Sequence, residues 1–398
     1  MANLPPKQLS PWQIFLLFLH LGCTSFGGPI AHLGYFRTAF VDERHWLTDR
    51  QYAHLVAYCQ LMPGPASSQV GILLGFQQRG HAGALAAWLG FTLPSALMMI
   101  GLAVGMVTHG ARLPAGLLHG LEIVAVAVVA QAIWGMARHL YTGLLFAVVA
   151  LIAGAAALLL TGAWTQLIII CGAALISALA SMAHPTYTER ALPVQMPKRD
   201  GAWLLGLFVI LLMTLPLLNQ YLGTHGLALF NAFYRSGALV FGGGHVVLPL
   251  LQAEVVPTGW VGNADFLAGY GAAQAMPGPL FTFAAYLGAI SAVEPTGWLG
   301  GSIALIAIFL PAYLLILGGL PFWSAITHHP RAQSALAGVN AAVIGLLMAA
   351  FYSPIWQSTV LGITDFLLAV LVLCALMLWN IPVWLVVLVA GMGGGLFL

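Results

Sequence analysis

Residues 60–65 read Gln-Leu-Met-Pro-Gly-Pro, and residues 274–279 read Gln-Ala-Met-Pro-Gly-Pro. Before them, Phe-Gly-Gly-Pro at 26–29 recurs as Phe-Gly-Gly-Gly at 241–244. The spacing between the matching motifs stays nearly constant over this length, which indicates that the chain consists of two homologous halves. Later matches hold the separation between 214 and 218 residues: Trp46 with Trp260, Leu93-Pro94-Ser95 with Leu310-Pro311-Ala312, and Gly120-Leu121-Glu122 with Gly338-Val339-Asn340.

The sequence around these motifs is strongly apolar. Of 398 residues, 61% are hydrophobic and only 6% are charged, whereas about 25% are charged in a soluble globular protein. The apolar runs are about 20 residues long, as membrane-spanning helices require, and they lack the alternation of barrel strands. The composition predicts an all-α polytopic membrane protein and excludes a soluble or disordered chain. The net charge of +2 excludes a basic surface for nucleic acid.

The repeats set the expected domain boundaries. We predict a first transmembrane repeat over residues 12–182, a cytoplasmic linker over 183–202, an extra helix over 203–222 and a second repeat over 226–398. One extra crossing between the halves inverts the second repeat relative to the first. Inverted repeats are the plan of many secondary transporters, whose substrate sites lie near mid-membrane at the repeat interface.

Four apolar runs are interrupted near their middle by the glycine and proline motifs. Each arm is about half as long as a membrane crossing requires. The runs therefore either cross as broken helices or enter and return as re-entrant hairpins. Re-entrant hairpins place most Lys and Arg residues on one face, as is typical of cytoplasmic loops, and are favoured with a cytoplasmic N-terminus and an external C-terminus. The interrupted runs are 12–40, 52–78, 227–252 and 266–290.

The Pro-Gly-Pro motifs are the clearest candidates for a binding site. Proline suits the first turn of a helix, so the helix after each motif aims free amides and a positive dipole end toward mid-membrane, which suits an anion. A structural kink and tight backbone packing are the competing interpretations. The candidate substrate-binding residues are Gly27, Gly28, Gln60, Pro63, Gly64, Pro65, Ser67, Ser68 and Gln69 in the first repeat, and Gly242, Gly243, Gln274, Pro277, Gly278, Pro279 and Thr282 in the second.

Ionisable residues inside apolar runs supply further candidates, because hydrocarbon penalises charge. Arg37 and Arg235 are candidates for pairing with a dianion, and interfacial anchoring is the alternative for Arg37. Glu122, His32 and His245 are candidate proton-coupling groups, with structural hydrogen bonding as the alternative. The cysteines lack metal-ligand spacing, and no catalytic cluster or nucleotide motif is present. We therefore expect no metal, no cofactor and no enzyme activity.

Longer strings carry a family resemblance. It covers residues 12–352, includes both copies, and is interrupted by minor departures at Ile30 and at Asp42-Glu43. The chain resembles the long, two-repeat form of the chromate ion transporter (CHR) family. The strings are FGGPIAHLGYFRTAFVDERHWLT from residue 26, YCQLMPGPASSQVGILLG from 58 and GFTLPSALMM from 90, then FGGGHVVLPLLQAEVV from 241, GYGAAQAMPGPLFTFAAYLGA from 269 and IFLPAYLLILGGLPFW from 308.

The resemblance implies a multi-pass protein of the bacterial inner membrane that exports chromate, is driven by the proton motive force or by anion exchange, and gives chromate resistance. Two other functions stay open. One is a carrier for sulfate or molybdate, since a site for a tetrahedral dianion need not discriminate strongly between isosteres. The other is a membrane-embedded enzyme subunit. The expected partners are a small inorganic oxyanion and the lipid bilayer, and a homodimer is left open.

Overall fold

The structure, a computed structural model, describes residues 9–109, 115–139, 144–160, 165–180, 196–241, 246–323 and 329–397. Across these ranges the regular elements are helical and no strand occurs. The chain is therefore an all-α polytopic membrane protein, as predicted. Within the same ranges, five helices are long and apolar enough to cross a membrane: Ala66–Thr108, Gly116–Arg138, Lys198–Leu222, Gly297–Gly318 and Pro330–Thr359.

The helices follow the two predicted repeats, and α8 lies between them. The first repeat contains α1 (Pro11–Thr24), α2 (Gly28–Arg37), α3 (Asp49–Leu61), α4 (Ala66–His109), α5 (Ala115–His139), α6 (Leu144–Leu159) and α7 (Thr165–Leu179). After α8 (Lys198–Leu222), the second repeat contains α9 (His225–Leu239), α10 (Val247–Val255), α11 (Asn263–Ala273), α12 (Phe283–Ile290), α13 (Gly297–Gly318), α15 (Pro330–Ala350), α16 (Gln357–Thr359), α17 (Ile363–Met377) and α18 (Val383–Phe397).

Both interrupted segments of the first repeat are re-entrant hairpins. α1 and α3 run inward, and α2 and the first part of α4 run back to the same face. The backbone leaves helical geometry at Arg79 and Gly80, where α4 reverses. There Arg79 Nε donates to the carbonyl of Leu9, just before α1, at 2.9 Å. Because the hairpins begin and end together, we call this the first face.

The second repeat enters from the opposite side. The start of α9, the loop before α11 and the end of α12 meet at His225, Trp260 and Ser291. The His225 ring lies edge-on to Trp260 with centroids 4.6 Å apart, and the amide of Ala292 donates to the carbonyl of Trp260 at 2.8 Å. We call this end the second face.

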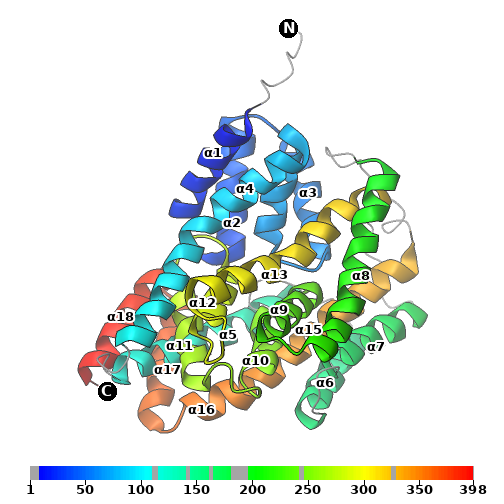
Figure 1. The fold of residues 1–398 in the computed structure, drawn as a ribbon. Helices are drawn as coiled ribbons and strands as arrows, with labels where there is room; N and C mark the ends of the chain where they lie inside the picture. The colour runs from blue at the N-terminus through cyan, green and yellow to red at the C-terminus, as the bar shows by residue number, and fades with distance from the viewer. Residues whose placement is uncertain are drawn as a thin grey trace.

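The inversion is visible in the path of the chain. In Figure 1, α1 lies at the top, the α9–α12 hairpins lie in the lower half, and α8 runs between the two ends. The part of α4 after Gly80 and helix α13 cross the whole molecule in opposite directions. His81 of α4 meets the Tyr313 hydroxyl of α13 at 2.8 Å near the first face. The two repeats are therefore inverted, as predicted.

Aromatic packing holds the first hairpin closed. Phe18 of α1 lies 5.7 Å from Phe36 and 5.3 Å from Phe40, between ring centroids. All three side chains are fully buried. The remaining helices join the repeats, because α5 packs against α11, α17 and α18, and α6 and α7 pack against α15. Small residues allow this close approach.

The inverted topology can be tested with one matched pair of cysteines. Arg50 and Ala264 are the second residues of α3 and α11, and both are exposed. Arg50→Cys and Ala264→Cys, made in a background without the four native cysteines, are expected to react with a membrane-impermeant maleimide from opposite sides of sealed vesicles. The basic first face is expected to be cytoplasmic. Labelling of both from the same side would contradict the inverted fold.

Candidate functional site at the crossing of the two tips

The two Pro-Gly-Pro turns meet in the interior and exchange backbone hydrogen bonds. We call Pro63–Pro65 the first tip and Pro277–Pro279 the second tip. The amide of Gly64 donates to the carbonyl of Val240 at 2.7 Å, and the amide of Gly278 donates to the carbonyl of Ser25 at 2.9 Å. Ser25 and Val240 directly precede the two glycine-rich motifs. Each tip is therefore held by the interrupted segment of the other repeat.

Side chains at equivalent positions of the two repeats also pack against the tips. A Cβ on Gly64 would lie 2.6 Å from Cβ of Ala312, and a Cβ on Gly278 would lie 2.9 Å from Oγ of Ser95. Ala312 and Ser95 occupy equivalent places in α13 and α4. Both glycines have positive φ, +124° and +93°, which other residues rarely adopt. Only glycine therefore fits at either tip.

A buried histidine links the second tip to the helix that follows the first. His32 of α2 is 1% exposed. Its Nδ1 lies 3.4 Å from Oγ of Ser67, its ring lies near the backbone of Ser25, and it packs edge-on against Phe91. Since Ser25 also binds Gly278, these contacts form one continuous polar region. We call it the central cluster: Ser25, His32, Ser67, Ser68, Thr92 and Ser95.

Several buried polar atoms of this region have no hydrogen-bond partner within the part of the chain that the structure describes. An unsatisfied buried group costs about 1–3 kcal/mol, so such a concentration points to a ligand. Hydroxyl and amide N–H groups are donors, and the first-turn amides of α2 and α4 add further donors. These groups suit an oxyanion without a fixed cation. The atoms are Oγ of Ser25 and Ser68, Oγ1 of Thr92, Nε2 of His32 and Nε2 of Gln274.

Two predicted ligands use their donors inside the chain. Gln69 Nε2 donates to the carbonyl of Pro63 at 2.6 Å. Thr282 Oγ1 donates to the carbonyl of Pro279 at 2.9 Å. Each side chain braces the tip of its own repeat: the single hydroxyl proton of Thr282 is used in this contact, and so is one of the two Nε2 protons of Gln69. Their direct role in binding is therefore less well supported than that of Ser68.

The other binding residues predicted from the sequence differ in how deeply they are buried. Gln60 is exposed, whereas Gln274 is half-buried. The four tip prolines, Pro63, Pro65, Pro277 and Pro279, are buried. Gly27 is the exposed N-cap of α2, and Gly28 is the first residue of that helix. Gly242, Gly243 and His245 lie outside the described residues.

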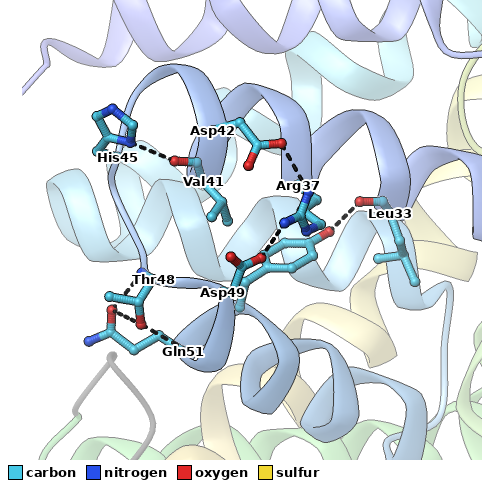
Figure 2. Close-up of polar contacts among 9 residues, drawn as sticks. Leu33, Arg37, Val41, Asp42, His45, Thr48, Asp49 and Gln51 are labelled. Carbon is cyan, nitrogen blue, oxygen red and sulfur yellow. Dashed lines mark hydrogen bonds and ion pairs between the residues drawn. The ribbon is translucent and has the colours of Figure 1, made fainter.

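Both candidate arginines are paired with carboxylates. Arg37 binds Asp42 at 3.0 Å and Asp49 at 2.5 Å on the partly exposed first face, as Figure 2 shows. The hydrogen bond to Asp49, together with the two negative charges, raises the pKa of Arg37. Arg235 pairs with Glu254 between α9 and α10. The expected pairing of either arginine with a dianion therefore gains no support from these contacts.

Sequence reasoning missed three members of the central cluster, Ser25, Thr92 and Ser95. The signal that identifies them is a difference between the repeats. Positions that are polar in the first repeat are apolar in the second, so the polar part of the site belongs mainly to one repeat. The matched pairs are Ser25 with Val240, Ser67 with Phe281, Thr92 with Phe309 and Ser95 with Ala312, while Ser68 with Thr282 keeps a hydroxyl in both.

Glu122 lies apart from the place where the two tips meet. It is buried in α5, and its Oε2 is 3.5 Å from Nδ1 of His119. It is therefore placed where it can titrate without touching the central cluster.

Comparison with known proteins agrees with the two-repeat architecture. The chromate transporter family model matches residues 12–178 and 227–395. A chromate transport protein of Pseudomonas aeruginosa is 28% identical over 86% of this chain and 80% of its own length. A probable chromate transport protein of Synechococcus elongatus is 27% identical, covering 97% and 95%. One from Cupriavidus metallidurans is 28% identical, covering 85% and 81%. No solved structure matches the chain.

Proposed function

We propose that this chain, which belongs to the chromate transporter family, carries chromate out of the cell across the bacterial inner membrane and so gives chromate resistance. The relatives named as chromate transport proteins support the substrate. The apolar helices support a multi-pass membrane location. Its place in a transporter family, together with paired mid-membrane breaks, supports transport rather than enzyme catalysis.

The observation that carries the substrate site is the set of unpartnered donors in the central cluster. Chromate is a tetrahedral dianion whose oxygens accept hydrogen bonds. The hydroxyls of Ser25, Ser68 and Thr92 and the first-turn amides of α4 would replace its water. Neutral donors and helix dipoles stabilise the dianion without the full charges that would slow its release.

The reciprocal tip contacts suggest how access alternates. The first hairpins enter from the first face and the second hairpins from the opposite face. Release of the Gly278–Ser25 bond would free the second tip, and release of the Gly64–Val240 bond would free the first. We propose that these two bonds open in turn, which exposes the crossing to one side at a time.

Sulfate is the second candidate substrate. The donors where the two tips meet are neutral hydroxyl and amide groups, and none of them distinguishes chromium from sulfur. Sulfate is therefore expected to compete with chromate, and anion exchange becomes a second way to drive transport beside the proton gradient.

Removing single hydroxyls tests the site. Ser68→Ala and Thr92→Val are each expected to weaken chromate binding about 5- to 30-fold, which corresponds to roughly 1–2 kcal/mol for a lost hydrogen bond. The dissociation constant is measured on purified protein by equilibrium dialysis with radiolabelled chromate, with and without sulfate. Ser302→Ala, on the exposed side of α13, is the control and should bind normally. Wild-type affinity in both variants would move the site elsewhere.

A further inference from the structure

A second buried polar cluster lies outside the proposed substrate site. His119 and Glu122 of α5 and Asp365 of α17 touch in series. Nδ1 of His119 lies 3.5 Å from Glu122 Oε2, and its Nε2 lies 3.0 Å from Asp365 Oδ1. The side chains are 25%, 11% and 12% exposed in that order. One imidazole therefore bridges two buried carboxylates.

The two carboxylates are held differently. Oδ2 of Asp365 accepts hydrogen bonds from the amides of Leu361 at 3.0 Å and Gly362 at 3.1 Å, while its Oδ1 faces His119. These bonds favour the ionised carboxylate. Glu122 faces His119 at the longer distance of 3.5 Å. Glu122 is therefore the member best placed to gain and lose a proton.

The charges of the three side chains show how many protons the cluster takes up. With both carboxylates ionised and the imidazole protonated, the cluster has a net charge of −1. One proton taken from water by the Glu122 carboxylate makes the cluster neutral. Since a low-dielectric surrounding penalises net charge, the uptake of one proton by Glu122 stabilises the cluster.

The elements around α5 add few competing charges. Helix α11 contributes Asp265, which interacts electrostatically with Glu122, and the buried Tyr270. Helix α18 contains no charged residue. Arg331 of α15 and Tyr352, just beyond it, are exposed. Asp265 adds negative charge and so favours a proton on Glu122.

A backbone contact connects this cluster to the second tip. Gly271 of α11 packs so closely on α5 that a Cβ there would overlap the carbonyl oxygen of Leu121, the neighbour of Glu122. Three residues after Gly271 comes Gln274, and the second tip follows at Pro277. The backbone beside Glu122 is therefore packed directly against the helix that carries the second tip.

We propose that His119, Glu122 and Asp365 form a proton-binding site whose occupancy sets the position of α11 and the second tip. The inference rests on the proposed transport function and supplies its coupling device. The cluster lies toward the second face, where α11 begins and where the N-terminal end of α5 packs against the C-terminal end of α18. A proton that arrives from that face would reach Glu122 before the crossing.

The test separates proton coupling from substrate binding. Purified wild-type protein and Glu122→Gln are reconstituted into liposomes, and chromate uptake is measured against pH and with an imposed pH gradient. Wild-type uptake is expected to change by up to about tenfold per pH unit, the limit for a one-proton step, and to respond to the gradient. Glu122→Gln should transport with a flat profile and ignore the gradient, while its chromate dissociation constant stays within about twofold of wild type.

Further variants keep the result decisive. His119→Gln should also flatten the pH profile, because it removes the bridge between the carboxylates. Glu43→Gln, at an exposed surface ion pair with Arg44, is the matched control and should behave as wild type. If Glu122→Gln fails to fold, Glu122→Asp is used and should shift the profile along the pH axis. A normal pH profile and gradient response in these Glu122 and His119 variants would overturn the proton site and leave the substrate site standing. Absence of chromate binding by the wild type would overturn the proposed function instead.

Discussion

Gly278→Ala is expected to abolish most chromate uptake and to lower the melting temperature of the purified protein. The residue has φ +93°, where an added Cβ costs about 1–2 kcal/mol. The new methyl would also lie 2.9 Å from Oγ of Ser95 and 3.2 Å from the carbonyl oxygen of Phe91. Such overpacking costs a further 1–3 kcal/mol or so. The sum is a large fraction of the stability of a typical protein.

The structural change caused by the substitution is expected mainly where the two tips meet. Pushing Gly278 away from α4 stretches its hydrogen bond to Ser25, which lies near His32. Gly64→Ala, which meets Cβ of Ala312 at 2.6 Å, should act similarly on the first tip. Melting temperature and initial uptake rate are measured for each variant against Gly105→Ala, because a Cβ at Gly105 of α4 would meet no atom within 4 Å. The double variant Gly278→Ala with Ser95→Gly should recover part of the loss, since it removes the collision but not the strained φ. Unchanged stability and uptake in Gly278→Ala would contradict the close packing of the tips.

The architecture could be predicted from the sequence because its signals are local or periodic. Apolar runs of fixed length predict the crossing helices, and the repeated motifs predict the paired breaks. The one extra apolar run between the repeats predicts the inversion. The sequence left open whether the interrupted runs cross the membrane or return as hairpins. The structure shows hairpins in the first repeat, because Arg79, where α4 reverses, contacts Leu9, just before α1. That contact joins residues far apart in sequence and leaves no local pattern.

The site was predictable only in part. Ser67 and Ser68 follow from the position of the first tip, because the first turn of a helix is set by the proline motif. The partners of the tips, Ser25 and Val240, depend on how two hairpins from different repeats pack. A local partner such as His119 for Glu122 is readable from its three-residue helical spacing, whereas Asp365 is distant in sequence. Likewise, Arg37 finds Asp42 five residues away, but Arg235 needs the α9–α10 hairpin to reach Glu254.

His32→Ala is expected to have the largest effect on chromate binding of any single side-chain truncation at the crossing. The ring contacts Ser67, the backbone of Ser25 and Phe91, so it positions both tips at once. Its buried Nε2 has no partner within the described residues, and in the neutral tautomer whose Nδ1 accepts from Ser67 this Nε2 carries the proton and can donate to an oxyanion. A hydrogen bond to a charged group contributes about 1.5–3 kcal/mol, which corresponds to a loss of affinity of roughly 10- to 150-fold. His32→Gln, which keeps an amide donor at similar reach, should lose less.

The control is His20→Ala on the exposed side of α1. The dissociation constant for radiolabelled chromate is measured together with the melting temperature of each variant. A folded His32→Ala protein with wild-type affinity would remove His32 from the site and leave the serine and threonine hydroxyls to hold the dianion alone.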